Sequence, residues 1–203
     1  MKSFLLRLKG RYIRENNKRI IAQAKKGFHA GDCTIISQNC IGGVLYHDLG
    51  MQFLSPTINA FIPEPGFMKL VLDLRHYMAQ ELVVRWGGEY PIGTLGDVEI
   101  HFMHYETCKE AKEAWDERKT RINWSKIFVI GTDRDGFDAA AYEQWKTIPY
   151  PKILFTAHPE FTVDAVCFPE YAADGQIDDL IPERKFYRGG TLMKRLNVFE
   201  VQK

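Results

Sequence analysis

The stretch TIISQNCIGGVLYHDLG, residues 34–50, decides the fold. Its first three residues are a β-branched run that predicts a short strand, and the polar residues 37–40 predict a turn after it. Gly42 and Gly43 then lead into an apolar segment with helical character. A strand, a polar turn, glycines and a helix in this order are typical of α/β proteins that present a nucleophile or a set of backbone N–H groups to a ligand. We therefore expect a functional site at this turn.

The rest of the chain predicts an α/β fold. The apolar run 126–131 is continuous, as expected for a strand that is covered on both faces. A helix separates it from a strand at 152–156, and this βαβ order implies parallel pairing. Thr107 and Glu110 form a capping box that predicts the start of another helix. The other predicted elements are helices at 67–80, 107–122 and 137–146, strands at 98–104 and 165–168, a loop at 87–96 and a short element at 192–201. We expect a mostly parallel sheet that is flanked by helices in three layers.

Charge is divided unevenly along the chain. Residues 1–28 contain nine Lys and Arg side chains and one acid, a net charge of +8, whereas the remaining residues carry −7. Apolar residues fall at helical spacing in the same stretch, namely Phe4, Leu5, Leu8 and Tyr12. We predict a basic amphipathic helical extension at 1–28, in two pieces hinged near Gly10, and a single α/β domain at 29–203. The helix either lies on an anionic membrane surface or packs its apolar stripe on the domain.

The composition is that of an ordinary globular protein, with 45% hydrophobic and 26% charged residues. The four cysteines show neither a CxxC pair nor zinc-ligand spacing, which favours reduced thiols in the cytoplasm. His101 and His104 alternate to opposite faces of their predicted strand, so no metal site is predicted. No apolar run reaches the ~18 residues of a membrane span, and the first residues are not typical of a signal peptide. We expect a cytoplasmic protein, peripheral at the inner face of the membrane if residues 1–28 bind lipid, with no nucleic-acid partner.

Polar residues follow each predicted strand of the sheet. In an open parallel sheet, ligands bind beyond the carboxyl ends of the strands, so these residues are predicted to surround one crevice. They are Ser37, Cys40, His104, Asp133 and His158. This set contains a nucleophile, a base and an orienting acid. We predict Cys40 or Ser37 as the nucleophile, His104 as the base, and Asp133 as its orienting acid or a substrate ligand.

Each of these residues also has a structural interpretation. Cys40 fits a small buried hydrophobic residue as well as a thiol activated by a helix N-terminus. Ser37 fits a helix cap, and Asn39 fits either a cap or a donor to an oxyanion. Asp133 and Asp135 fit either an ordinary turn or a pair that holds a divalent cation on a nucleotide sugar.

Further residues are assigned to substrate binding. Arg188 belongs to a basic loop that fits either a phosphate-binding loop or a solvated one. Arg118 is predicted to lean inward from its helix, and Arg121 to pair with Glu117 on the outside. The full substrate-binding set is Asn39, Gly42, Gly43, Tyr46, Arg118, Arg121 and Arg188.

Four segments carry a resemblance to a known family. They are SQNCIGGVLYHDLGMQFLSPTINAF, DVEIHFMHY, EAWDERKTRIN and IFVIGTDRDG, within residues 30–160. The chain resembles the bacterial domain-of-unknown-function family 1919, whose turn reads Ser-Asn-Asn-Cys-x-Gly-Gly and is followed by a Tyr and a later Ser-Pro-Thr. Here Gln38 replaces the first Asn. Members of that family look like components of capsular or exopolysaccharide gene clusters. The strand and Asn-Cys turn also resemble, more faintly, those of coenzyme-A-dependent capsule acyltransferases.

The resemblance implies a role in the biosynthesis of surface polysaccharide. Our first hypothesis is a transferase that moves an acyl or other group onto a glycan or a lipid-linked sugar. One alternative is a glycosyltransferase that uses a nucleotide sugar. Another is a non-catalytic glycan-binding or assembly protein that stacks sugars on Trp86, Tyr90 and Trp115. The sequence does not decide between coenzyme A and a nucleotide sugar as the cofactor.

Overall fold

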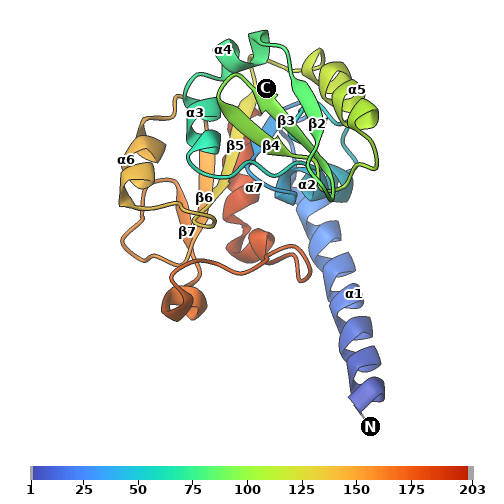
Figure 1. The fold of residues 1–203 in the computed structure, drawn as a ribbon. Coiled ribbons are helices and arrows are strands. Elements are labelled where there is room, and N and C mark those ends of the chain that lie inside the picture. Colours follow the sequence, from blue (N-terminus) through green and yellow to red (C-terminus); the bar gives the residue numbers. More distant parts are fainter. Residues whose placement is uncertain (1, 201–203) are drawn as a thin grey trace.

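Two β-sheets form the framework of the chain. The computed structural model describes residues 2–200, with side chains from residue 7 onward. Sheet A is parallel, in the order β1-β5-β6-β7, and its strands span Thr34–Ser37, Ile127–Thr132, Lys152–Thr156 and Ala165–Cys167. Sheet B is antiparallel, and its strands β2, β3 and β4 span Val83–Trp86, Pro91–Leu95 and Val98–His101. The chain thus has an α/β fold with a parallel main sheet, as the sequence predicts (Figure 1).

Helices surround both sheets (Figure 1). The α-helices are α1 (Lys2–Gly27), α2 (Ile41–Leu49), α3 (Gly66–Leu72), α4 (Leu74–Ala79), α5 (Cys108–Lys119), α6 (Ala139–Thr147) and α7 (Thr191–Leu196). Short 3₁₀ helices lie in the C-terminal part, at η1 (Pro169–Asp174), η2 (Lys185–Gly190) and η3 (Asn197–Phe199). The predicted short element at 192–201 corresponds to α7 and η3, and its last residue lies outside the described part of the chain.

Sheet A is buried on both faces because its residues alternate between two hydrophobic cores. In β5, Ile127 and Val129 belong to one core, whereas Phe128 and Ile130 belong to the other. The first core also contains residues of sheet B and of α3, α4, α5 and α6. The second core contains residues of α1, α2 and α7. The prediction that residues 126–131 are covered on both faces is confirmed.

Three predictions about helices have different outcomes. The capping box is confirmed, since Thr107 Oγ1 accepts a hydrogen bond from Glu110 N at 3.2 Å. The predicted helix at 67–80 is instead two helices that meet at Asp73, whose dihedral angles of φ −132° and ψ 54° are not helical. The predicted hinge at Gly10 is wrong, because α1 runs unbroken through it. Glycine weakens a helix by only about 1 kcal/mol, and it keeps the N–H that proline lacks.

Sheet B corrects the prediction of a loop at 87–96. β3 is the central strand of this sheet although it begins with Pro91 and contains Gly93. Proline is tolerated at a strand start, and a Cβ at Gly93 would lie 2.8 Å from side-chain atoms of Leu82 and Phe102. Only a glycine fits at position 93, because Leu82 and Phe102 pack closely against the strand there. The strand predicted at 98–104 ends at His101 and belongs to sheet B rather than to sheet A.

Within residues 2–200, one edge of β1 has no neighbouring strand, and side-chain hydroxyls bond backbone groups there. Ile35 N donates to Tyr46 Oη at 2.8 Å, and Tyr46 Oη donates to Cys33 O at 3.0 Å. Ser37 N donates to Thr57 Oγ1 at 3.1 Å. Because buried backbone groups must be paired, these contacts tie α2 and the segment around Thr57 to β1. The Tyr and the Ser-Pro-Thr of the sequence motif therefore have a structural role.

The C-terminal half of α1 packs on the rest of the chain. Ala24 is buried in the second core. Asn17 Nδ2 donates to Pro182 O at 2.8 Å, and Asn197 Nδ2 donates to Gly27 O at 2.7 Å. The other half of the helix projects away from the sheets, and Tyr12 is 73% exposed (Figure 1).

Two observations complete the description of α1. Leu8 of the predicted apolar stripe is also exposed, whereas the side chains of Phe4 and Leu5 lie outside the described residues. Within residues 2–200, no helix has both the length and the apolar character required to cross a membrane.

The hydroxyl of Tyr46 can be tested by the substitution Tyr46→Phe. The change leaves a buried N–H and a buried C=O without their partner, and we expect a loss of about 1–3 kcal/mol in the free energy of unfolding for each. Urea unfolding measures the effect, and Tyr12→Phe on the exposed part of α1 is the matched control. Equal stability of the Tyr46→Phe variant and the wild type would contradict a structural role for this hydroxyl.

Candidate functional site

The turn between β1 and α2 is built by local hydrogen bonds. Ser37 is 1% exposed, and its Oγ accepts from Gly42 N at 3.2 Å. Asn39 Oδ1 accepts from Ile41 N at 3.1 Å. Both side chains therefore satisfy N–H groups at the start of α2, which is the structural interpretation of these two residues. The buried Ser37 hydroxyl has no open path to a substrate, whereas Cys40 at the end of the turn is only partly buried.

The two glycines of the turn allow α2 to approach its neighbours closely. A Cβ at Gly42 would lie 2.7 Å from the Ser37 Cβ, which is too short for a real contact. A Cβ at Gly43 would lie 3.3 Å from side-chain atoms of Ile58 and Asn59. Packing alone accounts for both glycines, which the sequence assigned to substrate binding.

Cys40 and His104 lie side by side. Cys40 Sγ is 3.2 Å from His104 Nε2, although the two residues are 64 positions apart. His104 is exposed and sits in the turn that follows β4, not at the end of a strand of sheet A. The structure thus brings together the predicted nucleophile and the predicted base. The predicted reason for their proximity, convergence of parallel strand ends, is wrong for His104.

Neighbouring contacts hold the turn of His104 in place. Tyr105 Oη donates to Ile58 O at 3.3 Å, and Arg118 Nη1 donates to Tyr105 Oη at 2.6 Å. Arg118 Nη1 also reaches Ile58 O at 3.3 Å. Arg121 Nη1 donates to Phe53 O at 3.4 Å, and its guanidinium pairs with Glu117 as predicted. Arg118 and Arg121 therefore contact the segment 53–58, which also completes the edge of β1.

The surroundings of Cys40 keep its thiol protonated. Burial raises the pKa of the Cys40 thiol above its ordinary value, and the negative charge of Asp179 raises it further. A resting thiolate beside an imidazolium is therefore disfavoured at neutral pH. At 3.2 Å, His104 Nε2 is well placed to accept the Sγ proton as the sulfur attacks. This corresponds to general-base activation of a neutral thiol.

Asp133 does not face His104. Its Oδ2 accepts from Thr156 Oγ1 at 2.9 Å and from Ala157 N at 2.6 Å, and its Oδ1 accepts from Ile177 N at 2.9 Å. The carboxylate thus joins the ends of β5 and β6 to the backbone at Ile177. Both oxygens are occupied by donors from the chain itself, so we assign Asp133 a structural role at the edge of sheet A.

Asp135 and His158, the other polar residues predicted near these strand ends, do not join the Cys40–His104 pair. Asp135 is exposed, at a positive φ of 60°. His158 contacts Glu160 and Gly175 O. Among the residues that the structure describes, no group of three or more His, Cys, Asp or Glu side chains is close enough to hold a metal ion.

Gln38 is a residue whose position the sequence did not single out. It is 1% exposed, and its Oε1 accepts from Thr132 N at 3.0 Å and from Thr132 Oγ1 at 2.8 Å. Its Nε2 is buried with no hydrogen-bond partner among the described residues. Gln38 therefore ties the turn after β1 to the end of β5.

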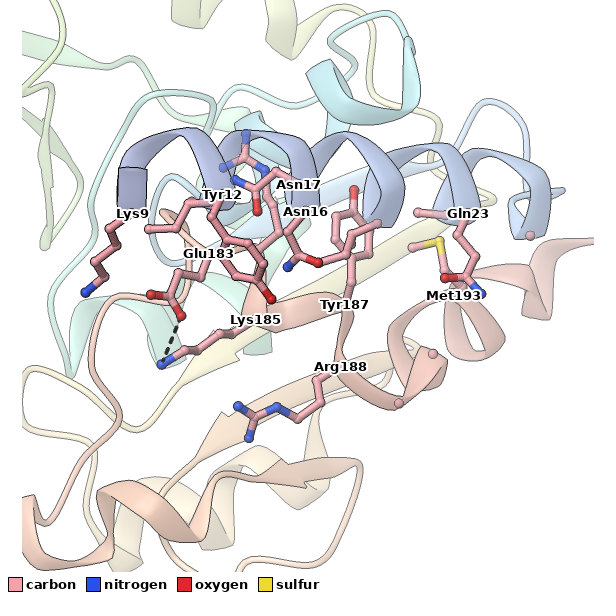
Figure 2. Close-up of a pocket in the computed structure, with 17 residues that line it drawn as sticks. Lys9, Tyr12, Asn16, Asn17, Gln23, Glu183, Lys185, Tyr187, Arg188 and Met193 are labelled. Carbon is pink, nitrogen blue, oxygen red and sulfur yellow. Dashed lines mark ion pairs between the residues drawn. The ribbon is translucent and has the colours of Figure 1, made fainter. Parts of the chain in front are cut away.

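A separate cavity of about 770 Å³ lies between α1 and the C-terminal segment (Figure 2). Arg188, predicted to bind substrate, lines it, whereas neither Cys40 nor His104 does. The lining comes from residues 9–27 and 183–193. Because these two parts of the chain meet only in the folded structure, the charge pattern of residues 1–28 alone did not reveal the cavity. The structure therefore separates the predicted site residues into two places.

The fold and the paired thiol and imidazole define an α/β protein with a candidate nucleophile at the first βα turn. The chain belongs to the family described as domain of unknown function (DUF1919), whose model matches residues 11–200. It is also 37% identical, over 128 residues, to a Haemophilus influenzae protein described as an uncharacterized protein. The matched part is 62% of this chain and 62% of that relative. The family model places the chain in the family, and neither similarity specifies a reaction.

The protonation state of Cys40 can be measured by alkylation with iodoacetamide. Because only the thiolate reacts and burial raises the pKa of Cys40, the rate at Cys40 should rise with a midpoint above the ordinary thiol value of about 8.5. Peptide mass spectrometry separates Cys40 from the other cysteines, and the Cys40→Ser variant identifies the background. A midpoint below about 7 would instead show a preformed thiolate–imidazolium pair, contrary to this reading.

Proposed function

We propose that this protein is a group transferase, with acyl transfer the favoured reaction, in which Cys40 is the nucleophile and His104 the general base. The observation that carries the proposal is the 3.2 Å contact between Cys40 Sγ and His104 Nε2. A nucleophile within hydrogen-bond reach of a base is the arrangement that covalent catalysis requires. His104 is exposed and Cys40 partly so, which leaves the pair accessible to a donor.

The proposed reaction has two steps. Cys40 Sγ attacks the carbonyl carbon of an acyl thioester or ester while His104 Nε2 takes the Sγ proton, and the leaving group departs with that proton. In the second step, a hydroxyl of the acceptor transfers its proton to His104 and attacks the thioester on Cys40. This transfers the acyl group from Cys40 to the acceptor, and His104 gives the proton back to Sγ to restore the thiol.

We infer that Asn39 stabilises the oxyanion in both steps. Its Oδ1 is used by Ile41 N, but its Nδ2 has no acceptor among the described residues. It is next to Cys40 in sequence, so its Nδ2 remains available as a donor. Gln38 of the same turn is 1% exposed and holds Thr132 through its Oε1, so it is assigned no role at the oxyanion.

The nature of the acceptor comes from the family resemblance. We infer a glycan or lipid-linked sugar as acceptor and a coenzyme A thioester as donor, at the cytoplasmic face of the membrane. The projecting, basic half of α1 supports that location, because Arg7, Arg11 and Arg14 are exposed there. In this proposal, residues 1–28 act as a basic extension of a three-layer domain formed by residues 29–203.

The alternative functions have less support from the geometry. A glycosyltransferase that holds a cation through Asp133 and Asp135 conflicts with the three hydrogen bonds that occupy the Asp133 carboxylate. A glycan-binding surface of stacked aromatic residues cannot include Trp115, which is fully buried. Trp86 is 52% exposed, but it is not paired with a second exposed ring from the predicted set.

Covalent labelling tests the proposed chemistry with p-nitrophenyl acetate as an acyl donor. We expect one acetyl group on Cys40 by peptide mass spectrometry, no labelling there in Cys40→Ala, and a rate lower by about 10²–10⁴ in His104→Ala. Cys167→Ala and His47→Ala are the matched controls, because neither residue belongs to the pair. Unchanged acetylation of His104→Ala at Cys40, or acetylation only at other residues, would refute the assignment.

A further inference from the structure

We propose that the cavity between α1 and the C-terminal segment 183–193 binds an anionic amphiphile, that is, a phosphate-sized head group joined to an aliphatic chain. Its volume of about 770 Å³ lies within the range of small-molecule sites. The proposal concerns binding alone. It therefore does not rest on the chemistry of Cys40, which does not line this cavity.

Cations gather at one end of the cavity. Figure 2 shows Lys9 and Lys185 on the same side, with Arg188 nearby, whereas Gln23 and Met193 lie at the other end. Glu183 is the acidic residue of the lining and is 3.8 Å from Lys185 Nζ. The hydrogen bond from Lys185 Nζ to Tyr171 Oη raises the pKa of Lys185, so this side chain stays charged.

Not all of the positive charge is free for a ligand. Arg188 is paired with Glu170 at 2.6 Å, and its guanidinium lies 4.7 Å from the centre of the Phe168 ring. Arg184 lines the cavity but donates to both oxygens of the buried Asp48. Lys185 is shared with Glu183 and Tyr171, so Lys9 supplies the positive charge that no described acid near the lining balances, which favours a head group with one negative charge.

Two polar groups of the lining make no hydrogen bond of good geometry among the described residues. Tyr187 is 8% exposed, and burial together with the nearby Asp48 carboxylate raises the pKa of its hydroxyl, which therefore stays protonated as a donor. Asn17 Oδ1 is likewise buried and unpaired, although its Nδ2 is bonded to Pro182 O. A buried hydroxyl without a partner is unfavourable, and an oxygen of a bound ligand would supply the missing acceptor. The Tyr187 hydroxyl can donate to a head-group oxygen, whereas Asn17 Oδ1 is an acceptor and would need a donor such as a protonated head-group hydroxyl.

Part of the remaining wall is aliphatic. Ile13, Ile20 and Ala24 of α1 and Met193 of α7 form it, beside the polar side chains of Asn16 and Gln23. Branched and flexible apolar side chains of this kind suit an alkyl chain rather than the flat ring of a base. A cationic end and an aliphatic wall in one cavity match a ligand with the same two parts.

Isothermal titration calorimetry of the full chain tests the proposal with dodecyl phosphate below its micelle concentration. Two control ligands carry the two parts separately. Inorganic phosphate has the charged head group without a chain, and dodecyl maltoside has the alkyl chain without a charge. We expect dodecyl phosphate to bind at least about tenfold more tightly than either, since charge and chain both contribute. Binding of inorganic phosphate or dodecyl maltoside as tightly as dodecyl phosphate would overturn the amphiphile assignment.

Two variants locate the binding within the cavity. Lys185→Gln and Tyr187→Phe should each weaken dodecyl phosphate by about tenfold, the effect of one lost hydrogen bond to a charged group. Lys146→Gln on α6 and Tyr90→Phe near sheet B should bind as the wild type does. Tyr187→Phe removes an unpaired hydroxyl, so its unfolding midpoint should not fall. Equal affinity in all four variants would refute the site.

Sedimentation with vesicles identifies the source of the ligand. Binding to phosphatidylglycerol vesicles but not to phosphatidylcholine vesicles, reduced by Lys185→Gln and Tyr187→Phe, would support the cavity with a membrane lipid as ligand. The variants could instead bind vesicles as the wild type does while soluble dodecyl phosphate does not bind. That result would assign the membrane attraction to the exposed bases of α1 and contradict the cavity proposal. The Cys40→Ala variant should behave as the wild type throughout, which separates this result from the outcome for the proposed transferase.

Discussion

The hydroxyl groups of Tyr46 and Thr57 complete the hydrogen bonding of the free edge of β1, and the candidate site depends on them. Tyr46 fixes α2 against the strand that precedes it, while Thr57 fixes the segment that follows α2 to the same strand. The turn that carries Cys40 lies between these two attachments. A strand edge that another strand would normally cover is here covered by side chains, so sheet A begins at β1 without an exposed backbone.

The long connection between β1 and β5 brings His104 to this turn. Sheet B and its helices occupy residues 66–119, and the chain around Ile58 binds Tyr105 and Arg118. The same segment completes the edge of β1 through Thr57. One loop therefore supports both halves of the pair, which explains how two residues 64 positions apart come within 3.2 Å. At the other side of α2, the buried ion pair of Asp48 and Arg184 joins this helix to the chain that lines the cavity.

Local patterns in the sequence were sufficient for sheet A, α2 and α5. Apolar runs, a capping box and a βαβ order are short-range signals, and each is confirmed at its predicted place. Sheet B was missed because Pro91 and Gly93 are turn residues by local preference, and only close packing against Leu82 and Phe102 makes a strand there. The cavity was beyond prediction because α1 and residues 183–193 meet only through tertiary packing. His104 was named for a reason that does not hold, since its strand belongs to the other sheet.

Long-range ¹H–¹⁵N NMR spectra of the histidine rings test the coupling of Cys40 to His104 most directly. If the thiol and the imidazole are in contact, Cys40→Ala should shift the ring-nitrogen signals of His104. The signals of His47 and His76, both exposed and outside the pair, should stay as they are. Identical His104 spectra in the wild type and in Cys40→Ala would contradict the existence of a thiol–imidazole centre.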